Sequence, residues 1–389
     1  MTFIGPAGRI LAIAALATTA VACGSTSRPG TSTSAPAPIV AVPAVSIMVP
    51  PIVPRALHPA PPQLVATIGT LARGFQGRFG IAIRAVDEGW TVQETARQRL
   101  PQQSVSKLWV ALTLLDLRDQ GRIRLDQPII VRPQDITLFH QPIAYMVKGD
   151  GYHTTVGDLL SRALTHSDNT ANDRLLTAVG GPPAVRAMIE RKRLGDIRFG
   201  PGERLLQSKT AGLVWDQSWA GTNGFEIARS RLTPAARSAA LDAYVADPPD
   251  GAAPIAIADA LARLARGELL SETSTRILLD TMGASVTGRA RLRAALPSGW
   301  KIAHKTGTGQ DLGGRNAGFN DVGLLTAPDG RRYAIAVMIG DTRRPIRERQ
   351  DLIQAVAGAV AAHAGGGRGG MGASPGPNPL ASPPAGNYR

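Results

Sequence analysis

The sequence predicts an α/β protein of the α+β type, in which an antiparallel sheet built from both ends of the chain is flanked by helices and interrupted by an inserted all-α subdomain. Two observations support this prediction. Runs of β-branched and apolar residues occur near both ends of the chain, whereas helical spacing of apolar residues fills its middle. The strand-like runs cover residues 79–86, 90–95, 300–306, 321–326 and 332–339.

Helical spacing marks the remaining elements in order. Leu64, Ile68 and Leu71 recur at intervals of three and four residues, which predicts a first helix. The turn signal Ala327-Pro328-Asp329-Gly330 joins the last two strands as an antiparallel pair. The predicted helices cover residues 63–74, 105–118, several segments of 155–193, and 346–363.

The two ends of the chain differ from its middle in composition. Arg9 precedes the apolar run of residues 10–22, which has the length of a secretory signal core and is too short to span a bilayer. We therefore expect a signal peptide over residues 1–23 and export of the protein to the periplasm. Residues 24–62 and 365–389 are rich in Pro, Ser, Thr, Ala and Gly without a periodic apolar face, which predicts disordered segments.

The remaining residues, 63–364, form the predicted catalytic domain. Cys23 is the only cysteine of the chain and follows Ala20-Val21-Ala22, an arrangement that resembles a bacterial lipobox with Ala20 in place of the usual Leu. Lipid attachment at Cys23 would anchor the protein to a membrane, and ordinary cleavage nearby is the alternative. In either case the catalytic domain has no thiol, which excludes disulfides and thiol catalysis.

Composition narrows the function further. The formal net charge is +14, but the basic runs are short and aromatic residues make up only 4 % of the chain, so we predict no nucleic-acid partner. None of the six histidines has the spacing of a metal-binding helix pair, and we expect no metal or other cofactor. We expect a monomer.

The first motif is Ser104-Val105-Ser106-Lys107, at the start of the predicted apolar helix. Residues three apart lie about one turn apart on a helix, so the Ser104 hydroxyl and the Lys107 amine can meet. A lysine amine has a reference pKa of ~10.4 and acts as a base only where its surroundings lower that value. Taken alone, the motif favours a helix cap followed by a solvated lysine.

Two more motifs follow it. Ser167-Asp168-Asn169 precedes a predicted helix, where such residues are preferred caps. Functionally, Ser167 could pass a proton to a leaving nitrogen and Asn169 could hold a substrate amide. Lys305-Thr306-Gly307-Thr308 ends a predicted strand and offers a positive charge, two hydroxyls, and a glycine where backbone or ligand comes close.

S-x-x-K, S-D-N and K-T-G, in this order, form the signature set of class A β-lactamases and penicillin-binding proteins. The chain resembles this family over residues 63–363, including Gly180-Gly181-Pro182 and the stretch from Gly288 to Trp300 that precedes K-T-G. The resemblance implies that Ser104 attacks the lactam carbonyl, with Lys107 helping to activate it.

The same resemblance assigns further roles. The backbone amides of Ser104 and Thr308 are implied to form the oxyanion hole. Ser167 with Lys305 would protonate the departing nitrogen. Lys305, Thr306 and Thr308 would bind the carboxylate of the drug.

Class A enzymes use a loop glutamate to activate the water that hydrolyses the acyl-enzyme, and Glu203 is the candidate here. Gln207 stands where the family usually has Asn, which predicts a differently held water and slow turnover. The chain between Glu203 and Lys305 is also longer than in compact class A enzymes, with the excess at residues 209–247. This excess either extends the loop beside the pocket or forms an added surface hairpin or helix.

Three more residues are candidates for substrate contact. Phe139 and His140 precede S-D-N and are expected to form a pocket wall. Arg315, shortly after K-T-G, is either an extra cation for the carboxylate or an ordinary surface arginine.

The predicted function is therefore hydrolysis of a small β-lactam by an exported serine hydrolase. One alternative is a penicillin-binding protein or D-Ala-D-Ala carboxypeptidase that acts on peptidoglycan stem peptides and deacylates slowly. A second alternative is a non-catalytic lipoprotein that binds cell-wall fragments or senses the drug. Glu203 favours hydrolysis, Gln207 keeps the first alternative open, and the intact Ser104-Lys107 pair argues against the second.

Overall fold

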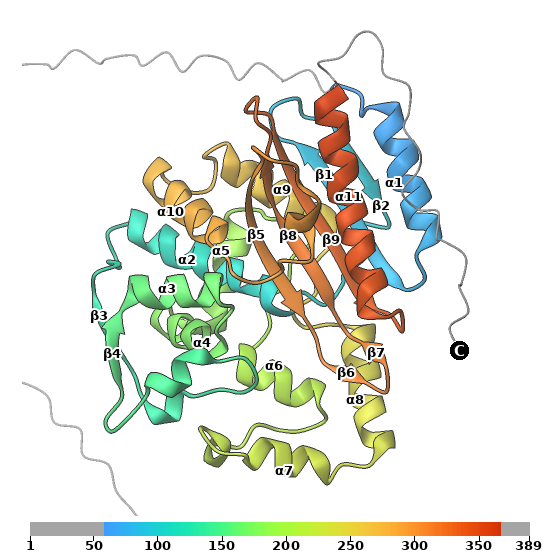
Figure 1. Ribbon diagram of the computed structural model, residues 1–389. Helices are drawn as coiled ribbons and strands as arrows, with labels where there is room; N and C mark the ends of the chain where they lie inside the picture. The colour runs from blue at the N-terminus through green and yellow to red at the C-terminus, as the bar shows by residue number, and fades with distance from the viewer. Residues whose placement is uncertain (1–57, 367–389) are drawn as a thin grey trace, which may run out of the picture. The chain divides into compact units, whose positions relative to one another are not determined.

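The structure is a computed structural model that describes residues 58–366 (Figure 1). The predictions for the signal peptide, for Cys23, and for most of the two terminal segments lie outside the described residues. The main sheet has five antiparallel strands in the order β2-β1-β9-β8-β5. The strands are β1 (Arg78–Ala85), β2 (Thr91–Glu94), β5 (Lys301–Thr308), β8 (Phe319–Thr326) and β9 (Arg332–Asp341).

The sheet confirms the predicted fold class, because β1 from the start of the chain pairs with β9 from its end. Each predicted strand matches an observed one, and the Ala327–Gly330 turn connects β8 to β9. Two smaller antiparallel pairs lie outside this sheet. They are β3 (Pro128–Val131) with β4 (Tyr152–Thr155), and β6 (Asp311–Leu312) with β7 (Arg315–Asn316).

Strand β9 shows why the sheet is covered on both faces. Successive side chains of a strand point to opposite faces. Ile335 and Val337 belong to the core that contains α1 and α11, whereas Ala334 and Ala336 belong to the core that contains α9. Small alanines on this second face let the helix pack close to the sheet.

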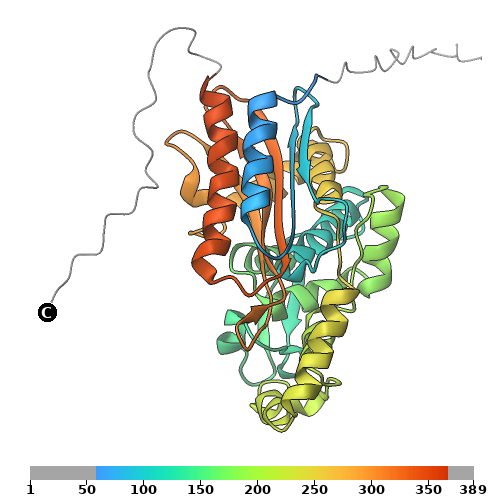
Figure 2. The same ribbon diagram turned by 90° about the vertical axis from the view of Figure 1, so that its right-hand side faces the viewer.

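Helices α1 (Pro62–Gly74) and α11 (Ile346–Gly366) lie side by side over one face of the sheet (Figures 1 and 2). Helix α1 begins one residue before its predicted start and α11 ends three residues after its predicted end. Helix α9 covers the other face, together with the helical subdomain. The helices on that side include α2 (Lys107–Asp119), α3 (Val156–Thr165), α4 (Asn169–Ala178), α5 (Gly181–Arg191), α9 (Pro254–Ala265) and α10 (Glu272–Gly283).

The excess residues 209–247, called here the inserted segment, are helical. They follow α6 (Glu203–Thr210) and contain the short turn Gln217–Trp219, α7 (Gly224–Ser230) and α8 (Pro234–Ala246). Phe225 of α7 is buried with Leu138 and makes an edge contact with Phe139, whose ring centroid is 5.4 Å away. The segment combines the two interpretations left open by the sequence, because it forms added helices and one of them, α7, borders the pocket.

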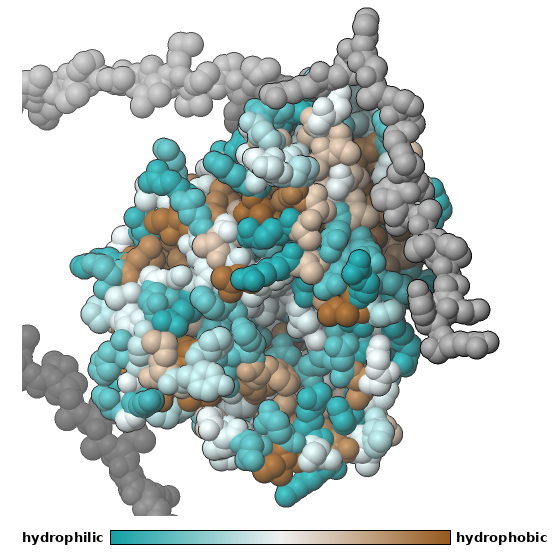
Figure 3. All heavy atoms as spheres, in the orientation of Figure 1, coloured by the Kyte–Doolittle hydropathy of each residue, from teal (hydrophilic) through white to brown (hydrophobic). Residues whose placement is uncertain are grey.

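On the face seen in Figure 3, hydrophobic side chains form small groups among hydrophilic ones. Over residues 58–366, none of the helices combines the length and the apolar character that crossing a bilayer requires.

The close packing of α9 on the sheet gives a stability prediction. Ala336→Leu adds three carbons to a fully buried position, so we expect the free energy of unfolding to fall by about 1–3 kcal/mol. Ala362→Leu, on the exposed side of α11, is the matched control and is expected to change it by less than about 0.5 kcal/mol. Urea unfolding of both variants measures the difference. Equal stabilities would contradict the close packing.

Candidate active site

The structure brings Ser104 and Lys107 together at the start of α2. A 3₁₀ turn, Gln103–Ser106, precedes the helix, so the predicted helix begins at Lys107 rather than at residue 105. The buried Lys107 Nζ donates hydrogen bonds to Ser104 Oγ at 2.7 Å and to Asn169 Oδ1 at 2.9 Å. It also forms an ion pair with Glu203. The lysine therefore joins the serine to two other segments.

The backbone before Ser104 is held in an unusual conformation. Gln103 has φ +54°, a region that residues other than glycine rarely adopt and that costs on the order of 1–3 kcal/mol. Its backbone N–H donates to Asp250 Oδ2 at 2.8 Å, and its side-chain amide donates to Tyr244 Oη at 2.8 Å. The strand end at Gly307 also lies close by, since a Cβ there would be 2.3 Å from the Gln102 carbonyl oxygen. The glycine is needed for this close approach of two backbones.

The second motif, Ser167-Asp168-Asn169, caps a helix with its aspartate and places its serine and asparagine in the site. Asp168 caps α4 by accepting from the Ala171 N–H at 2.9 Å, as expected of a helix cap. Ser167, with φ +60°, and Asn169 both line the cleft. The Asn169 side chain donates to the Leu138 carbonyl at 2.9 Å, which fixes its oxygen toward Lys107.

Strand β5 places Lys305 beside Ser167. Lys305 is fully buried, and its Nζ donates to Ser167 Oγ at 2.8 Å and to the Thr306 carbonyl at 2.9 Å. Burial, followed by the nearby charge of Lys107, lowers the pKa of Lys305 well below its usual value. The ammonium form of Lys305 is therefore a stronger acid than that of an ordinary lysine, which suits it to return a proton to the Ser167 oxygen.

Helix α6 starts at Glu203 and points it into the same site. Gly202, with φ +101°, makes the turn before it, and Asp173 of α4 accepts the Glu203 N–H at 2.9 Å. The side chain is buried, so its ion pair with Lys107 is shielded from solvent. Burial, and the adjacent Glu203, raise the pKa of Asp173.

Gln207, one helical turn after Glu203, is hydrogen-bonded to the 3₁₀ turn Gln103–Ser106, called here the serine turn. Its side-chain amide donates to Gln103 Oε1 at 3.0 Å and to Glu203 Oε2 at 3.4 Å. Gln310 in turn donates to the Gln207 carbonyl at 2.9 Å. The longer side chain thus bridges Glu203 to the residue before Ser104.

The hydroxyls of the third motif have their own partners. Thr306 shares a 2.9 Å hydrogen bond with Thr287, and Thr308 accepts from Arg291 Nη2 at 2.6 Å. Arg291 is buried, donates also to the Asn320 carbonyl at 2.6 Å, and stacks 3.7 Å from the Phe319 ring centroid. Burial lowers its pKa to about 10, so the guanidinium remains charged at neutral pH.

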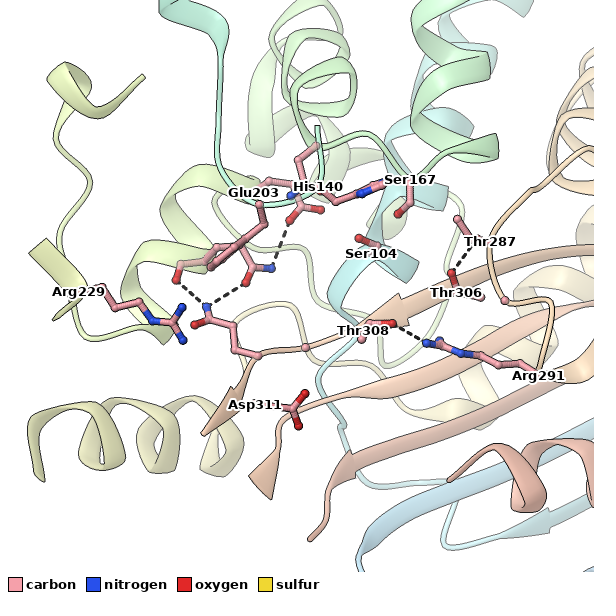
Figure 4. A pocket seen from close by; sticks show the side chains of 16 residues that line it. Ser104, His140, Ser167, Glu203, Arg229, Thr287, Arg291, Thr306, Thr308 and Asp311 are labelled. Carbon is pink, nitrogen blue, oxygen red and sulfur yellow. Dashed lines mark hydrogen bonds between the residues drawn. The ribbon is translucent and has the colours of Figure 1, made fainter. Parts of the chain in front are cut away.

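These groups surround one cleft of about 560 Å³, within the size range of small-molecule sites (Figure 4). Ser104 lies near its middle, and Thr308, Thr306 and Arg291 lie toward one end. Phe139 and His140 form part of the wall, as the sequence predicted. The His140 Nε2 is 2.8 Å from the His166 carbonyl oxygen, which holds its ring against this wall.

One predicted residue lies elsewhere. Arg315 does not line the cleft, because it forms ion pairs with Asp341, at 2.7 Å, and with Asp242. Arg291 lines the cleft although no sequence feature singled it out within the stretch that resembles the family. Three arginines alternate at positions 289, 291 and 293, and only the folded chain shows that Arg291 is the buried one facing the cleft.

The site contains hydrogen-bond donors and acceptors suited to acyl transfer. Within the described residues, no group of three His, Cys, Asp or Glu side chains is able to hold a metal. A serine paired with a buried lysine, between an antiparallel sheet and a helical subdomain, is the arrangement of an active-site serine hydrolase.

Comparison with known proteins identifies the family. The model of the β-lactamase enzyme family matches residues 63–364, and the chain belongs to this family. The extended-spectrum β-lactamase PER-1 of Pseudomonas aeruginosa is 29 % identical over 297 residues, which cover 76 % of this chain and 85 % of PER-1. The β-lactamase L2 of Stenotrophomonas maltophilia is 31 % identical over 256 residues, or 66 % of this chain and 70 % of L2.

Solved structures agree with this assignment. A β-lactamase from Chitinophaga pinensis matches with a TM-score of 0.64 and 26 % identity, covering 77 % of this chain and 99 % of that structure. An ancestral class A β-lactamase, GNCA, matches with a TM-score of 0.62 and 28 % identity over the same shares of the two chains. The resemblance to class A enzymes inferred from the three motifs is therefore confirmed.

The Asp250 carboxyl behind the serine turn gives a pH prediction. Burial raises its pKa to about 6, above the value of ~3.9 expected in the unfolded chain. Because the pKa is higher in the folded than in the unfolded state, the protonated carboxyl contributes its full stabilisation to the free energy of unfolding below pH ~3.9. This contribution is lost as the pH rises through 6.

We therefore expect Asp250→Asn, which mimics the protonated carboxyl, to remove this loss. The unfolding free energy of the variant relative to wild type should rise by about 2–3 kcal/mol between pH 4 and pH 7. Urea unfolding at the two pH values measures it, and a constant difference would show that Asp250 does not titrate in this range.

Proposed function

We propose that the protein is a serine β-lactamase that hydrolyses the β-lactam amide through a covalent intermediate on Ser104. The observation that carries this proposal is the contact of the Lys107 amine with both Ser104 Oγ and Glu203 at the floor of the cleft. One group activates the serine and another is available to activate water, within a chain of the β-lactamase enzyme family.

In the first half of the reaction, Ser104 Oγ attacks the lactam carbonyl carbon. Lys107 passes a proton to Glu203 and accepts the hydroxyl proton, and the backbone amides of Ser104 and Thr308 stabilise the oxyanion. The carbon–nitrogen bond of the ring then breaks. Ser167 gives its proton to the departing nitrogen and is reprotonated from Lys305, 2.8 Å away. Glu203 then releases its proton to solvent and Lys305 takes one up from solvent, so the net transfer is one proton from Ser104 to the nitrogen and Glu203 is again a carboxylate.

In the second half, Glu203 acts as the general base for a water molecule. The hydroxide adds to the acyl carbon, the ester bond to Ser104 Oγ breaks, and the proton returns to that oxygen through Lys107. Gln207 contributes by fixing Glu203 relative to the serine turn.

The substrate carboxylate is expected at the end of the cleft lined by Thr306 and Thr308, next to the buried Lys305. Arg291 joins this set, since it donates to Thr308 and adds a buried positive charge. Its Nη1 is held by the Gly307 and Asn320 carbonyls, so we expect it to act through its charge and by orienting Thr308. Arg315 has no role in this binding.

Export is part of the same proposal. The apolar run of residues 10–22 supports cleavage of a signal segment, a periplasmic location, and either lipid attachment at Cys23 or ordinary cleavage nearby. We also propose that the catalytic domain acts as a monomer without a cofactor.

The experiment is hydrolysis of a chromogenic cephalosporin by purified residues 25–389, with intact-mass spectra over time. We expect continuous turnover by wild type, slowed by Gln207 in place of the usual Asn, and no lasting adduct. Glu203→Gln keeps the size of the side chain but removes the base, so deacylation should slow by at least ~100-fold and an adduct on Ser104 should accumulate. Ser104→Ala is the control and should give neither adduct nor turnover.

Each other outcome is informative. A long-lived adduct in the wild type would favour the penicillin-binding protein that acts on stem peptides. Neither turnover nor adduct would favour the binding lipoprotein. Wild-type rates in Glu203→Gln would exclude Glu203 as the water-activating base.

A further inference from the structure

Arg229 of the inserted segment lies in the cleft and has no part in the reaction proposed above. It belongs to α7, and its side chain lines the cleft together with Gln207, Gln310 and Asp311. Figure 4 shows Arg229 at one end of the cleft and Arg291 at the other, with Ser104 and Thr308 between them. The site thus has a cation at each end of the nucleophile.

The guanidinium of Arg229 is not neutralised within residues 58–366. It makes no ion pair or hydrogen bond there, and its buried Nε has no hydrogen-bond partner. Two carboxylates that line this end of the cleft have other partners, since Glu203 pairs with Lys107 and Asp311 lies 3.6 Å from Arg349. Glu226 on the same helix attracts Arg229 electrostatically but forms no ion pair with it. A half-buried cation without a partner is costly to a fold, which suggests that a ligand supplies the missing charge.

Two neighbours hold Arg229 in place and strengthen its field. Its guanidinium carbon lies 6.0 Å from the centroid of the Phe139 ring, within reach of a cation–π contact. Burial, followed by the charge of Arg237 on α8, lowers the pKa of Arg229, whereas Glu226 on the same helix raises it. The inserted segment therefore adds positive charge to this end of the cleft.

The substrate chemistry determines which group can reach it. A β-lactam bicycle carries its ring carboxylate on one side of the reactive carbonyl and its acylamino side chain on the other side. With the carboxylate at Arg291 and Thr308 and the carbonyl at Ser104, the acylamino side chain extends toward Gln207 and Arg229.

We propose that Arg229 is a specificity-determining residue that selects β-lactams whose acylamino side chain bears a carboxylate. The inference rests on the proposed function and deepens it by naming a substrate class. Arginine suits this role because its planar fork can donate two parallel hydrogen bonds to a carboxylate.

Carbenicillin and benzylpenicillin provide the test, because they differ only by a carboxylate on the side chain. We expect Arg229→Gln to lower kcat/KM for carbenicillin at least tenfold, mainly by raising KM, and to change benzylpenicillin hydrolysis by less than threefold. Arg229→Lys keeps the charge without the fork and should retain an intermediate preference. An unchanged ratio of the two substrates in Arg229→Gln would overturn the proposal.

Arg231→Gln is the matched control, because it removes the same charge from an exposed position near the end of the same helix. We expect it to leave both substrates unaffected. An equal loss in Arg231→Gln would assign the effect to the long-range field and would also overturn the proposal. Failure of the proposed function is distinguishable, since the wild type would then hydrolyse neither penicillin.

Discussion

The buried amine of Lys107 is the interaction on which the arrangement of the site depends. A charged group without solvent requires several partners, and here they come from three separate segments. Ser104 lies on the same turn, Asn169 begins α4, and Glu203 begins α6. Removing one partner leaves the charge under-satisfied, so the serine turn, the helical subdomain and α6 constrain one another.

The sequence predicted those features that depend on local chemistry. Continuous runs of β-branched and apolar residues identified the strands, because a sheet covered on both faces buries successive side chains, as in β9. The three motifs identified the residues that meet at Ser104, because each motif needs only a fixed spacing and a suitable element. Asp168 shows the limit of this reasoning, since its motif position is explained by capping α4.

The missed residues depend on contacts between distant parts of the chain. Arg291 acts through its burial against Phe319 and its bond to Thr308, neither of which a linear pattern reveals. Arg315, by contrast, was a candidate for substrate binding that does not line the cleft. It is near Lys305 in sequence, but it belongs to the β6–β7 pair and its carboxylate partners hold it away from the cleft. The inserted segment was visible only as excess length, because its helices pack on residues far from it in sequence.

The contacts of the inserted segment show that it is more than a surface addition. Tyr244 of α8 donates to Asp250 at 3.0 Å and accepts from Gln103, so it supports the strained residue before the nucleophile. The α7 helix of the same segment supplies Arg229. The conformation of the serine turn and the charge at the far end of the cleft therefore depend on one stretch of chain. A change in how α7 and α8 pack would alter reactivity and substrate preference together, which links the geometry of the nucleophile to the choice of side chain.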